Sequence, residues 1–341
     1  TRARELDPHA YLAAERGGER TRGPAGGELP VATDIESALA LVPADQLPRL
    51  AALGSTRLPF ARITSGVELG LSLVAADSGS TPVIDRDDER DLSLLLQTAA
   101  DRAPDIWLAG LWLLGALELA VERGRVDVRW CQIAGPGRRA LWAPGAGHQD
   151  LSARRSLPRA ELEIRLYGCQ VGVVELPPWA RLVAAGCTFD AGDRDSAAIE
   201  APGATVRLRQ CTVHGAVAAG RLEASSCAFA GRIGVDRADL GFIRHSLVAR
   251  DSEAPRLYQS RVHTVSMVSL DPTSPGYLVL AENNGAAALA TGEGAAIPGA
   301  YGERGDHQRE LDTRTGEFLP IGMAPVHIDR TTLDLQRLAR S

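Results

Sequence analysis

Residues 125–133 read RVDVRWCQI, and a matching pattern returns at 163–171 (EIRLYGCQV), 181–189 (RLVAAGCTF), 205–213 (TVRLRQCTV) and 221–229 (RLEASSCAF). Two later segments, GFIRHSLVA at 241–249 and RLYQSRVH at 256–263, carry serine in place of the cysteine. The cysteine or serine therefore recurs at intervals of 38, 18, 24, 16, 19 and 14 residues. A sequence that repeats every ~20 residues predicts a fold built by stacking one structural unit.

Within each repeat, apolar and polar residues alternate as they do along a β-strand. The position three before the cysteine or serine is apolar throughout: Val128, Leu166, Ala184, Leu208, Ala224, Ile243 and Leu257. The position two after it is apolar as well: Ile133, Val171, Phe189, Val213, Phe229, Val248 and Val262. The positions two and four before it are mostly polar or amphipathic. One side of each strand therefore faces a core and the other faces solvent.

This pattern predicts an all-β protein, a right-handed parallel β-helix of about 7–10 coils with a short N-terminal helical cap and an irregular C-terminal tail. Seven coils stacked at ~4.8 Å would rise roughly 30 Å. Leucine-rich repeats have a similar period, but their L-x-x-L-x-L-x-x-N pattern is missing. A β-sandwich has turns as frequent as these but would not repeat one column of cysteine. Both alternatives are less compatible with the sequence.

The chain divides into four predicted regions. Residues 1–30 form a flexible N-terminal arm, and residues 31–66 form the cap, with short helices at about 34–42 and 46–53. Residues 67–282 form the β-helix, and residues 283–341 form a loop-rich C-terminal tail or cap. A cap is expected because a β-helix otherwise leaves its core open at the end.

Composition narrows the range of functions. The 341 residues carry 37 basic side chains, all arginine, against 43 acidic ones, a net charge of −6. A non-specific nucleic-acid binder is usually basic, so no nucleic-acid partner is expected. No apolar run reaches the ~20 residues of a membrane span, and no leader-like segment opens the chain.

The motifs of several common enzyme classes are missing. The sequence has no P-loop, no G-x-G-x-x-G between a strand and a helix, no H-E-x-x-H and no G-x-S-x-G. It has no C-x-x-C, so no metal site and no cofactor are predicted. The five cysteines are best interpreted as a column of small, unpaired thiols in a narrow core. Such thiols fit folding in the cytoplasm.

One acid–base pair is nevertheless predicted. Asp190 and His214 stand at the same position of successive repeats, three residues after the cysteine. In register, their Cα atoms would lie roughly 5 Å apart. A carboxylate that orients a histidine can serve as a catalytic pair. The alternative interpretation is an ion pair on a surface turn.

The outward positions of the strands carry a second candidate site. The arginines there are Arg129, Arg165, Arg207, Arg209, Arg244 and Arg256, and the tyrosines are Tyr167 and Tyr258. Arginine binds carboxylates through its fork of N–H groups, and tyrosine rings stack on sugars. An acidic glycan or the acidic surface of a partner protein would suit this face. The alternative is an ordinary solvated strand face, since Asp127 and Glu223 interrupt it.

Three segments carry a resemblance to known proteins: RVDVRWCQIAGPG (125–137), ATVRLRQCTVHGAV (204–217) and RLEASSCAFAGRI (221–233). Over roughly residues 100–330 the chain resembles the parallel β-helix proteins of the pectate-lyase-like superfamily. More narrowly, it is similar to bacterial β-helix proteins associated with gene clusters for phage-tail-like contractile particles. The calcium-binding and catalytic aspartate patterns of the lyases and galacturonases are not matched, so no catalytic residue is carried over.

The expected function is that of a non-enzymatic structural or binding protein, a rigid fibre, spike or baseplate-associated component of a phage-tail-like assembly. The resemblance implies partners within that assembly, a homotrimer, and a place in a released or extracellular particle after cytoplasmic synthesis. The alternatives are a polysaccharide lyase or glycoside hydrolase acting on an acidic glycan, and a glycan-binding β-helix without catalysis.

Overall fold

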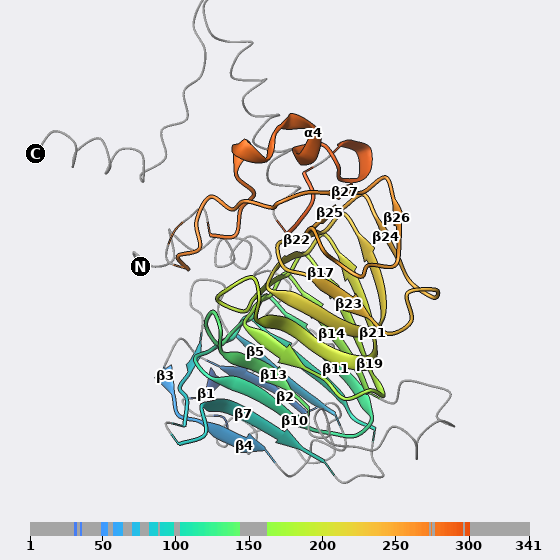
Figure 1. Ribbon diagram of the computed structural model, residues 1–341. Coiled ribbons are helices and arrows are strands. Elements are labelled where there is room, and N and C mark those ends of the chain that lie inside the picture. Colours follow the sequence, from blue (N-terminus) through green and yellow to red (C-terminus); the bar gives the residue numbers. More distant parts are fainter. Residues whose placement is uncertain are drawn as a thin grey trace, which may run out of the picture.

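A computed structural model describes residues 31–32, 35, 49–53, 57–63, 70–75, 82–87, 89–98, 103–143, 162–272, 274, 277–295 and 297–300. All strand pairs between its named strands are parallel, and each strand pairs with the equivalent strand of the next coil (Figure 1). This is the predicted parallel β-helix. One of its sheets has ten strands in sequence order, one for each of ten coils.

Each complete coil contributes a strand to three faces. The first face contains β1 (Val31–Ala32), β2 (Arg49–Leu53), β5 (Leu71–Ala75), β8 (Asp105–Ala109), β11 (Gly124–Arg129), β14 (Leu162–Tyr167), β17 (Ala180–Ala185), the second half of β19 (Ala197–Arg209), the second half of β21 (Ala216–Ser225), β24 (Phe242–Arg244) and β26 (Arg256–Tyr258). The second face contains β3 (Arg57–Leu58), β6 (Val83–Ile84), β9 (Trp112–Leu113), β12 (Gln132–Ile133), β15 (Gln170–Val171), β18 (Thr188–Asp190), β20 (Thr212–His214), β22 (Ala228–Phe229), β25 (Leu247–Val248) and β27 (Arg261–Val262). The third face contains β4 (Ala61–Ile63), β7 (Leu92–Gln97), β10 (Ala116–Ala120), β13 (Arg139–Trp142), β16 (Val173–Glu175), the first halves of β19 and β21, and β23 (Ile233–Val235). Because β19 and β21 continue around a corner, the first and third faces form a single 17-stranded sheet.

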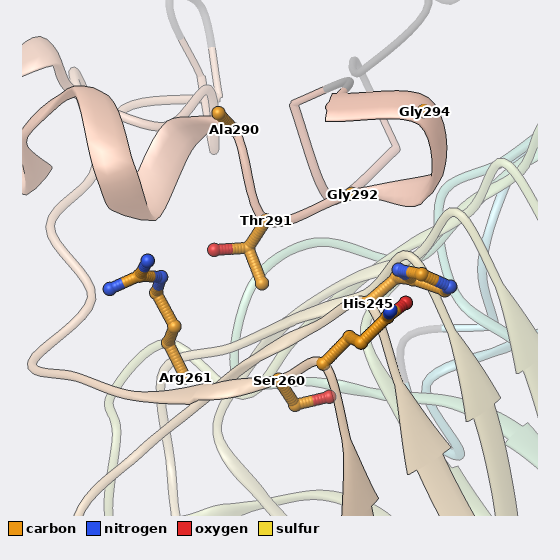
Figure 2. A pocket seen from close by; sticks show the side chains of 8 residues that line it. His245, Ser260, Arg261, Ala290, Thr291, Gly292 and Gly294 are labelled. Atoms are coloured by element: carbon orange, nitrogen blue, oxygen red, sulfur yellow. The ribbon is translucent and has the colours of Figure 1, made fainter.

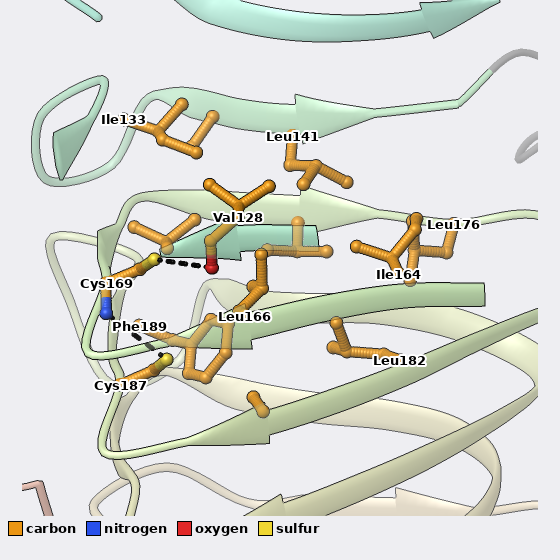
Figure 3. Packing of buried hydrophobic residues seen from close by; sticks show 14 of the residues in the cluster. Val128, Ile133, Leu141, Ile164, Leu166, Cys169, Leu176, Leu182, Cys187 and Phe189 are labelled. Atoms are coloured by element: carbon orange, nitrogen blue, oxygen red, sulfur yellow. Dashed lines mark hydrogen bonds between the residues drawn. The ribbon is translucent and has the colours of Figure 1, made fainter. Parts of the chain in front are cut away.

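The core consists of the apolar columns predicted from the repeat. Val128, Leu166 and Phe189 are fully buried, and Figure 3 shows such side chains from neighbouring coils packed together. The last coil is the exception, because no described coil covers it. Leu257 is 39% exposed and Val262 is 56% exposed, although they occupy the same columns.

The chain turns from the first face to the second through a residue with a left-handed backbone. These residues directly precede the cysteine or serine, and their φ angles lie between 47° and 63°: Trp130, Gly168, Gly186, Gln210, Ser226, His245 and Gln259. Side chains are uncommon in this conformation, and glycine adopts it freely. Only two of these seven residues are glycine. The left-handed backbone at the corner is therefore stabilised mainly by the contacts around it and not by the residue type.

The cysteine and serine column stabilises this corner. All five cysteines are free and buried, as the sequence predicted. The Cys187 thiol donates to the carbonyl of Ala185 at 3.3 Å, and its Sγ accepts the N–H of Cys169 at 3.4 Å (Figure 3). The Ser246 hydroxyl donates to the Arg244 carbonyl at 2.7 Å and accepts the N–H of Cys227 at 3.0 Å. Thiol and hydroxyl therefore fill the same structural position, which explains why serine replaces cysteine in the later coils.

The N-terminal end differs from the expected helices in its described residues. The helix expected over 46–53 is wrong for its described part, since 49–53 forms strand β2 and pairs with β5. A residue pattern too short to show its period allowed both interpretations, and pairing with the next coil decides for the strand. The arm at 1–30, the tail after residue 300 and most of the helix at 34–42 lie outside the described residues. The four-region division therefore stays a prediction.

The described residues between 264 and 300 leave the coil and lie against the second face; we call this segment the C-terminal strap. It contains the short helical turns η3 (Glu282–Asn284), α4 (Ala286–Leu289) and η4 (Glu293–Ala295). Its apolar residues Val265, Leu280 and Ala288 pack in one cluster with Ala228 and Leu247 of the second face. In Figure 1 it is the orange segment that carries α4. An irregular segment at this end agrees with the prediction.

Candidate functional sites: a covered acid–base pair and an open cationic face

The structure brings Asp190 and His214 together. They are register partners on β18 and β20, in successive coils of the second face. The His214 Nδ1 atom lies 2.8 Å from Asp190 Oδ1. The proximity expected from the repeat is therefore present, because parallel pairing sets equivalent residues of adjacent coils side by side.

The pair is enclosed, however. The side chains of His214 and Asp190 are only 2% and 3% exposed. Asp190 also accepts a hydrogen bond from the Tyr277 hydroxyl on Oδ2, and Oδ1 accepts the N–H of Gly192 at 2.7 Å. With three donors around it, the carboxylate is satisfied within the protein. A substrate cannot reach the pair in this arrangement, and a surface ion pair is excluded as well.

The C-terminal strap is the element that covers this face, and it is bonded to several coils. The Arg194 side chain donates to the carbonyl of Val265 at 2.7 Å. The backbone N–H of Gly299 donates to the Ser226 carbonyl at 2.8 Å, and that of Ala300 donates to Thr212 Oγ1 at 3.0 Å. Sequence reasoning missed Tyr277, because the strap has no repeat that would indicate which coil it contacts.

The outward face of the first sheet carries the predicted arginines and tyrosines. At its centre, the Arg129 guanidinium lies 4.1 Å from the ring centroid of Trp107 and 5.1 Å from that of Tyr167. Arg129 also lies 3.9 Å from Asp127. Stacking on two rings orients the guanidinium and leaves less of it available to a ligand.

Two glutamates neutralise much of the middle of this face. Glu163 lies 2.5 Å from Arg165 and 3.6 Å from Arg181. Although burial raises the pKa of Glu163, the hydrogen bond from Arg165 and the charges of both arginines hold it below its ordinary value. In the same way, Glu223 lies 2.8 Å from Arg207 and 2.5 Å from Arg221. Arg165 and Arg207 are therefore engaged within the sheet.

Toward the last coils the arginines are open. Arg209, Arg244 and Arg256 are exposed, and no ion pair within the described residues engages them. Arg244 donates to the Ser225 hydroxyl at 3.1 Å and lies 6.0 Å from the ring centroid of Phe242, and Tyr258 beside it is 51% exposed. The register aligns Arg209, Ser225, Arg244 and Tyr258 in one column across four coils. We call Arg209, Arg244, Arg256 and Tyr258 the cationic stripe.

Within the stripe, Arg209 and Arg244 are two strand spacings apart, about 10 Å. The predicted binding residues thus separate into two groups. Arg129, Arg165, Tyr167 and Arg207 form internal contacts, while Arg209, Arg244 and Tyr258 are available. Arg256, which the sequence placed on the same outward face, is available as well.

Other features place limits on the chemistry. In the described part of the chain, no cluster of three or more histidine, cysteine or acidic residues could hold a metal ion. No helix among these residues has the length and apolar character needed to cross a membrane.

Searches for similar proteins found no matching family model, no matching curated protein and no matching solved structure.

Proposed function

We propose that the protein is a non-enzymatic binding and structural protein, a rigid β-helix whose cationic stripe binds an acidic partner. The observation that carries this proposal is the contrast between the two candidate sites. Asp190 and His214 are enclosed beneath the C-terminal strap, whereas Arg209, Arg244 and Arg256 are exposed without a carboxylate partner in the described structure. Several exposed guanidinium groups without a described carboxylate partner on one face favour binding of a ligand that carries more than one carboxylate.

An acidic glycan is the partner that the stripe supports best. Its charges repeat along a chain, as the arginines repeat along the stack. The exposed Tyr258 ring offers an apolar surface to the face of a sugar. The hydrolase or lyase alternative requires the strap to leave Asp190, and no described contact favours that state.

The wider context is proposed from the strand pattern. Its similarity to β-helix proteins of phage-tail-like gene clusters supports a role as a fibre, spike or baseplate-associated part of such an assembly, as a homotrimer and within a released particle. Quantitative mass spectrometry of purified particles from the host tests this context. Absence of the protein from such particles would remove the assembly role but not the glycan-binding role.

The binding role is tested with polygalacturonate as the acidic probe and dextran as the neutral one. Titration should give saturable binding to polygalacturonate alone. Arg209→Ala combined with Arg244→Ala should weaken it at least ten-fold. Arg207→Ala combined with Arg221→Ala is the matched control, because Glu223 already neutralises these two side chains. Equal losses in both double variants would contradict the stripe as the site.

A further inference from the structure

A groove of about 580 Å³ lies at the corner between the last two coils and the C-terminal strap. One wall is formed by His245, Gln259, Ser260 and Arg261, and the other by residues 290–292 and Gly294. Figure 2 shows Arg261 and Thr291 pointing toward one another across it. None of these residues belongs to the cationic stripe or to the enclosed acid–base pair.

Three polar side chains of the corner wall line the groove without internal partners, whereas the Ser260 hydroxyl is bonded within the coil stack. In the described structure, no hydrogen bond or ion pair engages the imidazole of His245, the amide of Gln259 or the guanidinium of Arg261. His245 and Gln259 occupy the left-handed corner position, with φ angles of 52° and 47°. Stacking in one column places these two side chains on adjacent coils, where both line the same groove.

The opposite wall supplies hydrogen-bonding groups of a different kind. The Thr291 hydroxyl donates to the Ala287 carbonyl at 3.1 Å, so its oxygen remains able to accept a hydrogen bond. Ala290, Gly292 and Gly294 present little side chain to the groove. No carboxylate is among the residues that line the groove, and Glu293 is exposed in the same loop.

We propose that this groove binds a small, hydroxyl-rich carboxylate, a sugar acid such as a hexuronate. Arg261 would bind the carboxylate through its planar fork, and His245 would donate an N–H to it. Gln259 and Thr291 would bind the hydroxyls, since an amide both donates and accepts. The volume lies within the range of small-molecule sites. The proposal does not depend on the stripe, because a single sugar residue reaches no more than one of the two surfaces.

The test measures binding of glucuronate and galacturonate to the intact protein by isothermal titration and by NMR, with glucose and sulfate as comparison ligands. We expect both sugar acids to bind more tightly than glucose and sulfate. Arg261→Gln should weaken binding at least ten-fold. His245→Asn should weaken it several-fold, since asparagine tolerates the left-handed backbone but lacks the imidazole. Thr291→Val probes the opposite wall and should also weaken binding.

Arg250→Gln is the matched control, because Arg250 is an exposed arginine that lines a different groove, and it should leave the affinity unchanged. The Arg209→Ala and Arg244→Ala double variant should also leave it unchanged, which separates this site from the stripe. Circular dichroism checks that each variant is folded. Equal affinity for glucose, equal affinity for sulfate, or unchanged binding in Arg261→Gln would each overturn the proposal.

Discussion

At the scale of single residues, the corner column shows why the repeat contains cysteine or serine. The side chain must be small, must donate to the carbonyl two residues earlier, and must accept an N–H from the preceding coil. Alanine is small but forms neither bond, and valine adds volume as well. This requirement selects the residue, so the cysteines need no role in redox chemistry or metal binding.

Substitution of Cys187 tests this explanation. Cys187→Ser should cost about 1 kcal/mol or less, since serine forms the same two bonds at Ser246. Cys187→Val should cost roughly 2–4 kcal/mol, because it leaves the buried N–H of Cys169 unpaired and overfills the core. Urea unfolding measures both. Equal stability of the two variants would show that the two hydrogen bonds of this side chain do not stabilise the corner.

Asp127 gives a second prediction at this scale, based on pH. Burial raises the pKa of its carboxyl, and the charges of Arg129 and Arg165 offset only part of that effect. Between the ordinary pKa and the raised one, the folded state holds a proton that the unfolded state has released. Stability from this group therefore falls as pH rises through that window.

Asp127→Asn removes the titrating group. The variant should gain stability relative to the parent protein as pH rises from about 4 to 7, because the desolvated charge no longer forms. Urea midpoints at several pH values measure this. Glu163→Gln is the control of opposite sign, since the pKa of Glu163 is lowered and its ionised form is stabilised by arginine. A stability difference for Asp127→Asn that shrinks with rising pH would contradict the argument.

At the scale of elements, strands and strap differ in how far sequence predicts them. The strand columns were predictable because a period of two, repeated in every coil, specifies the inward residues. The adjacency of Asp190 and His214 followed from the same register. The strap has no period, so neither Tyr277 nor the burial of the pair could be predicted. Ionic partners such as Glu163 depend on side-chain conformations, which a repeat does not specify either.

Tyr277→Phe tests the attachment of the strap. Loss of the hydroxyl leaves one oxygen of the buried Asp190 without its donor, at a cost of about 1–3 kcal/mol. We expect hydrogen exchange in the strap to be faster than in the parent protein. Exchange in β11 and β14 should be the same as in the parent protein. Tyr258→Phe is the matched control, because that tyrosine is exposed. Unchanged exchange in Tyr277→Phe would show that other contacts hold the strap alone.

At the scale of the whole molecule, the last coil and the start of the C-terminal strap expose apolar side chains. Leu257, Val262, Val268 and Leu270 are each at least 39% exposed. Exposed apolar surface of this kind favours association. Together with the proposed spike role, this predicts a trimer of about three times 36.1 kDa in light scattering coupled to size exclusion. Leu257→Arg combined with Val262→Arg should shift it toward monomer, and a parent protein that is already monomeric would contradict the prediction.

The attachment of the strap also determines where the molecule carries mechanical load. The last bonds before residue 301 join Gly299 to Ser226 and Ala300 to Thr212, in coils well before β26 and β27. Tension applied to the chain beyond residue 300 therefore enters the stack at those coils and bypasses the last two. A cargo pulled from that end would strain the coil that carries Arg209, at one end of the cationic stripe. The stripe residues of the last two coils, Arg244, Arg256 and Tyr258, would keep their arrangement under force.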